Sequence, residues 1–196
     1  MAKIVQQDAP VLRAQAEFVN PKDFDSPRLK KILNDMKVAL EKEEDGVAIA
    51  APQIGVPLRI FVVSHRVFEM DTHSPDTALP PEQKKEEKAR ADDMVFINPE
   101  IIKVSRKKAW TPEGCLSVRW YYGEVARADK ATVRAYNEHG KLFTRGGGGL
   151  LAQIFQHEVD HLNGILFIDS ARHVERITKE EQERQKDMRN QHHHEQ

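Results

Sequence analysis

Several features are scarce in this sequence, and each absence narrows the class of protein. Cys115 is the single cysteine, so the chain cannot form an internal disulfide. The N-terminal residues, MAKIVQQDAPVLR, lack the apolar core of a signal peptide. No run approaches the roughly 20 apolar residues needed to cross a bilayer. We therefore expect a soluble protein of the reducing cytoplasm that has no membrane partner.

An excess of charge of either sign is also missing. The chain has 30 lysines and arginines against 31 aspartates and glutamates, which gives a formal net charge of −1. Bulk attraction to nucleic acid is therefore not expected, and any partner must be recognised locally. The 196 residues have the size of one domain, so we expect a single domain over residues 1–196.

Hydrophobic periodicity predicts one helix and several strands before the last quarter of the chain. Residues 25–46 place leucine, isoleucine and methionine on one helical face, with Asp25 or Ser26 as the N-cap and Gly46 at the end. β-Branched and aromatic residues recur in three runs typical of strands joined by hairpins. These runs are residues 58–64, 94–104 and 131–145, the last with a turn at 137–140. The pattern predicts an α+β protein without alternating βαβ units.

Three further segments have distinctive compositions. Residues 71–93 are rich in charge and proline, so we expect a mobile surface insertion. Residues 145–149, RGGGG, lack the Lys-Ser/Thr ending of a phosphate-binding loop and are interpreted as a flexible lead-in to a helix. Residues 171–196 are predicted to form a solvated C-terminal helix that frays, with a polar tail over residues 175–196.

The segment QHEVDHLNG, residues 156–164, places two histidines four apart on the last apolar helical pattern. His157 and His161 would lie one above the other on a helix and could converge on one ion. Leu150 and Ile154 fall near the same face, where an imidazole pair needs a partner such as a metal. Glu158 lies about 100° around the helix from His157, a position suited to moving protons on a metal-activated water. Ordinary hydrogen bonds to the two histidines are the alternative.

A catalytic transition-metal site usually takes three protein ligands and keeps one position open. The longer zinc-protease pattern, H-E-x-x-H-x-x-G-x-x-H, is matched through Gly164 and fails at Phe167, where a third histidine would stand. The downstream candidates are Asp169, His173 and Glu175. Upstream, the polar turn PEGCLS could present Cys115 as a thiolate, although a lone cysteine is more often a small buried hydrophobe. With the two histidines, Cys115 would form a site of one sulfur and two nitrogens.

Three separated motifs now coincide in order and spacing with those of a known family. GVAIAAPQIG (46–55), EGCLS (113–117) and QHEVDHLNG (156–164) resemble the signature segments of peptide deformylases. The resemblance implies antiparallel β-sheets that surround a central helix carrying the HExxH motif, to which the periodicity adds N-terminal and C-terminal helices. It also implies hydrolysis that removes the formyl group from the N-terminal formylmethionine of nascent polypeptides and releases formate.

The same resemblance implies roles for individual residues. The implied metal ligands are Cys115, His157 and His161. Glu158 resembles the acid/base of the family, and Gln53 with the backbone N–H of Leu116 resembles the donors to the developing oxyanion. The family usually uses Fe(II), and thiolate with imidazole also suits Zn, Ni and Co. Asp160 is interpreted as a structural partner of Asn163 or an arginine, because a fourth protein ligand would close the site to water.

Substrate binding is expected in an apolar pocket for the methionine side chain. The residues assigned to it are Gly46, Val47, Ala48, Leu150 and Ile154. Two departures from the family pattern concern this region. Ala48 stands where a glycine is usual, so its Cβ could crowd an extended substrate. Residues 119–122, Arg-Trp-Tyr-Tyr, replace the usual continuation after EGCLS, so the rim of the cleft could differ in shape.

Two alternatives to deformylation remain at this point. A deformylase-like protein could have lost or altered its substrate through Ala48 and the changed rim. An HExxH metallopeptidase would use the same helix, but Phe167 in place of a third histidine counts against it. Docking to the ribosome is left open as a partner interaction, because the neutral tail gives no electrostatic support for it. No specific nucleic acid is expected to bind.

Overall fold

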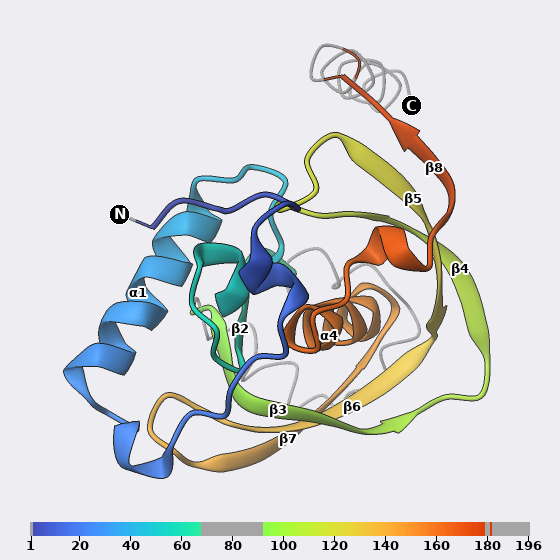
Figure 1. The fold of residues 1–196 in the computed structure, drawn as a ribbon. Helices are drawn as coiled ribbons and strands as arrows, with labels where there is room; N and C mark the ends of the chain where they lie inside the picture. Colours follow the sequence, from blue (N-terminus) through green and yellow to red (C-terminus); the bar gives the residue numbers. More distant parts are fainter. Residues whose placement is uncertain (1, 68–91, 179–180, 182–196) are drawn as a thin grey trace, which may run out of the picture.

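The computed structural model describes residues 2–67, 92–178 and 181. Two antiparallel sheets, helix α1 (Pro27–Glu41) and helix α4 (Gly149–Leu162) make up the fold, which is of the predicted α+β class (Figure 1). The strands are β1 (Ala48–Ala50), β2 (Ile60–Val63), β3 (Met94–Val104), β4 (Lys108–Gly114), β5 (Tyr121–Ala128), β6 (Lys130–Tyr136), β7 (Leu142–Gly148) and β8 (Arg172–Arg176). Short 3₁₀ turns are η1 (Pro10–Arg13), η2 (Pro21–Asp23), η3 (Ala51–Ile54) and η5 (Phe167–Asp169). Within these residues, no helix is long and apolar enough to span a membrane.

The larger sheet has five strands in the order β1-β2-β3-β6-β7, and the smaller sheet has the order β4-β5-β8. The bounds predicted for residues 94–104 are confirmed, because β3 covers the same residues. Residues 131–145 form the β6–β7 hairpin, as predicted. Strands β4 and β5, which run into and out of the EGCLS motif, pair along their whole length from Lys108↔Ala128 to Gly114↔Tyr122.

Helix α1 begins as predicted but ends earlier. The hydroxyl of Ser26 accepts a hydrogen bond from the N–H of Leu29 at 3.1 Å and caps the first turn. The helix ends at Glu41, so the prediction that Gly46 is its terminal glycine is wrong. The acidic run after the helix has no apolar side chain to bury, and Arg66 donates hydrogen bonds to the carbonyl groups at this end.

The glycine-rich segment is part of a strand, so its interpretation as a flexible lead-in is wrong. Residues 145–148 complete β7 in unbroken register with β6, and α4 starts directly afterwards at Gly149. A Cβ at Gly147 would lie 2.7 Å from the side chain of Leu151. Glycine is required there because the first turn of α4 packs closely against the end of β7.

The predicted C-terminal helix is wrong over its first part. Arg172–Arg176 form strand β8, which pairs antiparallel with β5. The unpaired backbone groups at the edge of β5 provide hydrogen bonds for this segment, and a strand needs no helical apolar pattern to use them. The remainder of the predicted tail, apart from residues 177, 178 and 181, lies outside the described residues. So does the predicted insertion, apart from residues 92 and 93.

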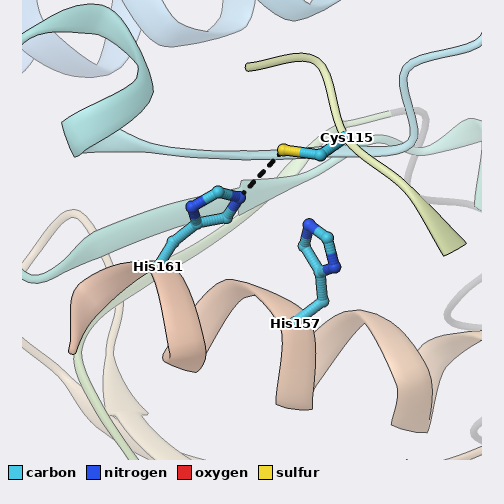
Figure 2. Close-up of side chains that lie close together, drawn as sticks. All are labelled: Cys115, His157 and His161. Carbon is cyan, nitrogen blue, oxygen red and sulfur yellow. Dashed lines mark hydrogen bonds between the residues drawn. The ribbon is translucent and has the colours of Figure 1, made fainter. Parts of the chain in front are cut away.

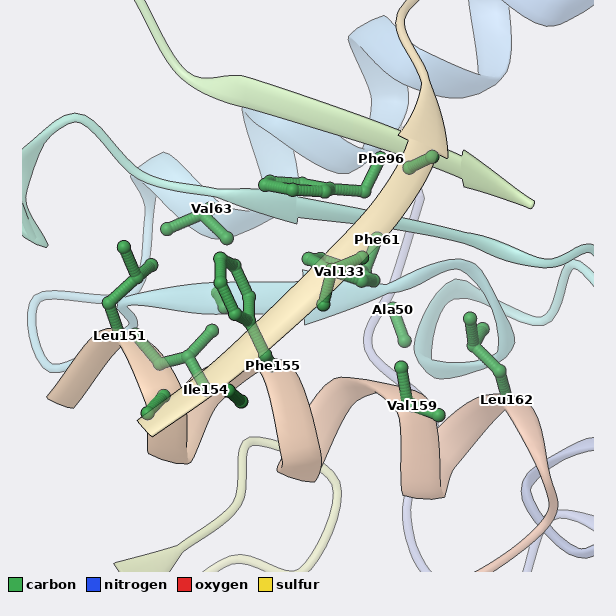
Figure 3. Packing of buried hydrophobic residues seen from close by; sticks show 14 of the residues in the cluster. Ala50, Phe61, Val63, Phe96, Val133, Leu151, Ile154, Phe155, Val159 and Leu162 are labelled. Carbon is green, nitrogen blue, oxygen red and sulfur yellow. The ribbon is translucent and has the colours of Figure 1, made fainter. Parts of the chain in front are cut away.

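Helix α4 is fixed by one apolar face that packs onto the five-stranded sheet (Figure 3). Buried residues recur on this face at every third or fourth position, as expected for a core helix. They are Leu151, Phe155, Val159 and Leu162. Opposite them, the rings of Phe61 and Phe96 stack with centroids 4.4 Å apart, and Phe155 meets Phe96 edge-on at 5.3 Å. The orientation of α4, and with it the direction of its polar side chains, is therefore set by core packing.

Candidate metal centre

The two histidines of α4 and the single cysteine come together in space. The ligand atoms of Cys115, His157 and His161 all lie within 4.8 Å of one another. Both imidazole rings project from α4 toward the sulfur of Cys115, which lies on a separate segment that follows β4 (Figure 2). Nε2 of His161 is 3.2 Å from this sulfur. Core packing of α4 and the pairing of β4 with β5 hold the two sides of the cluster in place.

The environment of Cys115 favours its thiolate form. Burial by itself raises the pKa of the thiol, but the charge of His161 and hydrogen bonds with both histidines outweigh burial and lower the pKa to about 5. The backbone N–H of Ser117 also lies 3.4 Å from the sulfur. Since the thiolate is the form that binds metals, Cys115 is prepared for this role.

The donor set fits a transition metal. One thiolate and two imidazoles are the ligands that Fe, Zn, Ni and Co accept, and three protein ligands leave a position for water or substrate. Among the described residues, the buried Nδ1 of His161 and Oε2 of Glu158 have no hydrogen-bond partner. Two of the three downstream candidates are engaged elsewhere: Asp169 pairs with Arg13 at 2.5 Å, and His173 lies 3.2 Å from Glu124. The third, Glu175, is exposed on β8, and none of the three belongs to the cluster.

Glu158 lies beside the cluster in a buried position. The residue as a whole is only 4% exposed. Burial raises the pKa of its carboxyl to about 6, although the two neighbouring histidines lower it in part. A carboxyl group with a pKa close to neutrality can both accept and donate a proton under ordinary conditions.

Gln53 and Leu116 reach the same place from different elements. Gln53 is part of η3, is 2% exposed, and its Nε2 lies 3.5 Å from the sulfur of Cys115. Its Oε1 accepts a hydrogen bond from the N–H of Ala50 at 2.8 Å, which orients the amide nitrogen toward the cluster. Leu116 follows the cysteine directly, and its carbonyl accepts a hydrogen bond from Gln6 at 3.1 Å.

A cavity of about 280 Å³ adjoins the cluster. Its lining includes all five residues assigned to substrate binding, namely Gly46, Val47, Ala48, Leu150 and Ile154. It also includes Gln53, Cys115, Leu116, His157 and Glu158. His161 is not among the lining residues. The changed rim, residues 119–122, lines the cavity as well, and Ala48 contributes both to the cavity and to the buried core.

The profile of the polypeptide deformylase family matches residues 1–177. This chain belongs to the peptide deformylase family. The Cys115, His157 and His161 cluster, read with this membership, indicates a bound metal ion.

Alignments with individual deformylases cover most of the chain. Peptide deformylase 1A of Arabidopsis thaliana, chloroplastic/mitochondrial, is 39% identical over 86% of this chain, which spans 61% of that relative. The peptide deformylase of Agrobacterium fabrum is 39% identical over 87% of this chain and 85% of its own length. A solved deformylase from Legionella pneumophila has a TM-score of 0.69 at 35% identity, covering 88% of this chain and 87% of its own. A Met-Ala-Ser-bound class I type b deformylase from Acinetobacter baumannii has a TM-score of 0.69 at 29% identity, covering 86% and 96% of the two chains.

One part of the candidate site could not be assigned from the sequence. Glu113 lies 2.9 Å from Nδ1 of His157 and accepts two hydrogen bonds from Arg127, at 2.7 and 3.0 Å. Arg127 also donates to Asp160 at 2.6 Å, which confirms that Asp160 has an arginine partner. Burial raises the pKa of Glu113, but His157 and Arg127 outweigh it and lower the pKa to about 2. The signal was a glutamate two residues before the cysteine, but its partner Arg127 lies on the next strand and could not be paired with it from sequence.

Proposed function

We propose that this protein is a metal-dependent hydrolase that removes the formyl group from the N-terminal formylmethionine of newly synthesised polypeptides. The observation that carries the proposal is the cluster of Cys115, His157 and His161, with donor atoms within 4.8 Å, beside a cavity that Cys115, His157 and Glu158 line. Family membership supports the reaction class. The Met-Ala-Ser ligand of the Acinetobacter relative supports a peptide that begins with methionine.

Cys115, His157 and His161 are the proposed metal ligands. Fe(II) is the ion that we propose for the cell, and Zn, Ni or Co would suit the same sulfur and nitrogen donors. When bound, the metal would supply a Lewis acid for the formyl group and for water. Glu113 would hold His157 in the tautomer that offers Nε2 as a ligand, because its carboxylate engages Nδ1.

Glu158 is the proposed acid/base. It would take the proton from the attacking water and deliver it to the amine that departs when the formyl C–N bond breaks. Its burial supports this role, since the raised pKa of about 6 suits both transfers. The products are formate and a peptide with a free N-terminal amine.

Gln53 and Leu116 are the proposed donors to the oxyanion that forms on the formyl oxygen. The side-chain amide of Gln53 is held in the cavity by its bond with Ala50, so it needs no reorientation during the reaction. The backbone N–H of Leu116 would be the second donor. Each donor of this kind can be worth roughly 3–4 kcal/mol in the transition state.

Leu150, Ile154 and Val47 are proposed to surround the methionine side chain of the substrate. An unbranched thioether suits such an apolar lining. We further propose that residues 1–196 act as one catalytic domain in the cytoplasm. N-formylmethionyl nascent peptides are the proposed substrates, and docking to the ribosome is not part of the proposal because the charge of the tail gives it no support.

Formate release from a formyl-methionyl tripeptide tests the proposal directly. Protein purified anaerobically and loaded with Fe(II) should turn the peptide over, and Glu158→Ala and Cys115→Ser should each abolish turnover. Glu158→Ala should still bind the metal, whereas Cys115→Ser should not. Glu100→Ala, at an exposed carboxylate paired with Arg134, is the matched control and should remain active. Metal binding without formate release by the parent would refute the proposal and favour a relative with a changed substrate.

A further inference from the structure

The loop that follows helix α1 forms part of the cavity wall without regular secondary structure of its own. It connects α1 to β1 and brings Gly46 and Val47 into the lining. The side chain of Arg66 holds the backbone of the loop, because its guanidinium donates hydrogen bonds to the carbonyl oxygens of Glu43 and Glu44 at 3.2 and 3.3 Å. These bonds attach the loop to the segment after β2. They do not set its distance from the opposite wall of the cavity.

Arg119 provides a contact across the cavity. It lies in the segment that follows Cys115 and is itself a lining residue. Its guanidinium donates to the carboxylate of Asp45 at 2.8 and 3.3 Å and also to Glu43. Asp45 lines the cavity too, so this ion cluster joins two walls that are 74 positions apart in sequence. The Arg119 side chain is 20% exposed and the two carboxylates are about one third exposed, so the cluster is partly shielded from solvent and stronger than a fully exposed pair.

The backbone that carries Arg119 is held by its neighbours. The N–H of Arg119 lies 3.4 Å from Oε1 of Gln6. The next residue, Trp120, has a φ of +70°, which is uncommon for a bulky side chain. Its carbonyl accepts a hydrogen bond from the N–H of Ile177 at 2.8 Å. The contacts that keep Trp120 in this costly conformation also hold the adjoining backbone of Arg119. Arg119 can therefore fix the position of the loop and does not simply follow it.

We infer that Arg119 is a positioning residue that clamps the loop after α1 to the segment after Cys115 and so maintains the width of the cavity. The inference rests on the proposed function for the identity of the substrate, an extended formylated peptide. The groups assigned to chemistry are held by other contacts: Gln53 by Ala50 and His157 by Glu113. Loss of the clamp therefore weakens substrate capture more than turnover.

Steady-state kinetics of Arg119→Ala test this separation. With Fe(II)-loaded protein and a formyl-methionyl tripeptide, KM should rise on the order of tenfold while kcat stays within about twofold. Arg119→Lys, which keeps the charge but not the forked geometry, should restore part of the loss. The Glu43→Gln, Asp45→Asn double variant should reproduce the defect, and combining it with Arg119→Ala should add little. Arg134→Ala, at an exposed pair with Glu100, is the matched control and should leave KM unchanged.

Hydrogen exchange supplies a readout that needs no activity. The N–H of Gly46 is bonded to the carbonyl of Glu43 at 3.0 Å within the clamped loop. Its exchange should accelerate in Arg119→Ala and not in Arg134→Ala. Unchanged KM with unchanged exchange overturns the inference, as does an equal fall in kcat and metal affinity. Absence of formate release from every protein, the parent included, overturns the proposed function, and the exchange rates then decide the clamp by themselves.

Discussion

The carboxylate of Glu113 lies 2.9 Å from Nδ1 of His157 and is shared with the guanidinium of Arg127. This contact fixes the ring of His157 and leaves Nε2 as its nitrogen available to a metal. Arg127 also donates a hydrogen bond to Asp160, so it connects Glu113 to the helix that carries the two histidines. The orientation of His157, a proposed metal ligand, thus depends on a strand-to-helix network in which Glu113 lines the cavity and Arg127 and Asp160 lie behind it.

Glu113→Gln should lower metal affinity by roughly 10- to 100-fold, because an amide of the same shape cannot orient and polarise the imidazole as a carboxylate does. Competition with a fluorescent chelator would measure the dissociation constant. Glu124→Gln, at a partly exposed carboxylate on β5 next to Arg172 and His173, is the control and should bind metal as the parent does. Equal affinities in the parent and Glu113→Gln would contradict the role of this contact.

Arg127→Met should lower the free energy of unfolding by about 3–5 kcal/mol, because it removes the guanidinium from the buried carboxylate of Glu113 and leaves only His157 as its partner. The Arg127 and Glu113 side chains are 9% and 2% exposed. Arg134→Met removes an exposed arginine that pairs with Glu100, and there we expect about 0–1 kcal/mol. Urea denaturation of the two variants under the same conditions makes the comparison, and similar losses would argue against the buried network.

Gly147→Ala should destabilise the fold by about 1–3 kcal/mol, because the new Cβ would lie 2.7 Å from the side chain of Leu151. Gly148→Ala is a neighbouring control with space available. Its nearest atom would be 3.7 Å away, and its φ of −122° is open to any residue. Thermal unfolding should show a lower Tm for the first variant only. Equal Tm values would mean that α4 can shift away from β7.

His139→Ala should raise the pKa of Asp25, which the hydrogen bond from His139 and then that from Lys30 hold below the ordinary value of 3.8. Because the pKa is lowered in the folded state, these contacts stabilise the fold above pH 3.8, and the contribution is lost as pH falls through the folded pKa. An NMR titration of the Asp25 carboxyl carbon measures the shift. His173→Ala, distant in sequence and paired with Glu124, should leave the titration unchanged.

Local sequence predicted much of the fold and the meeting of Cys115 with His157 and His161, and long-range pairing explains what it missed. The bounds of β3 and the cap at Ser26 followed from residue type and periodicity. The strand at Arg172–Arg176 could not be foreseen, since its stability comes from the edge of β5 and not from its own composition. The prediction for the RGGGG segment was wrong because glycine, which usually indicates flexibility, here leaves room for the helix to pack closely against the strand.

A bound ion could cross-link this chain, which has no disulfide. Cys115 follows a strand of the smaller sheet, whereas His157 and His161 belong to a helix buried on the larger one. An ion bound by these residues would join segments that are distant in sequence and act as a staple that stabilises the folded state by mass action. Such a staple is reversible, and its strength would follow the supply of metal in the cell. Metal starvation would therefore reduce the lifetime of the protein as well as its activity.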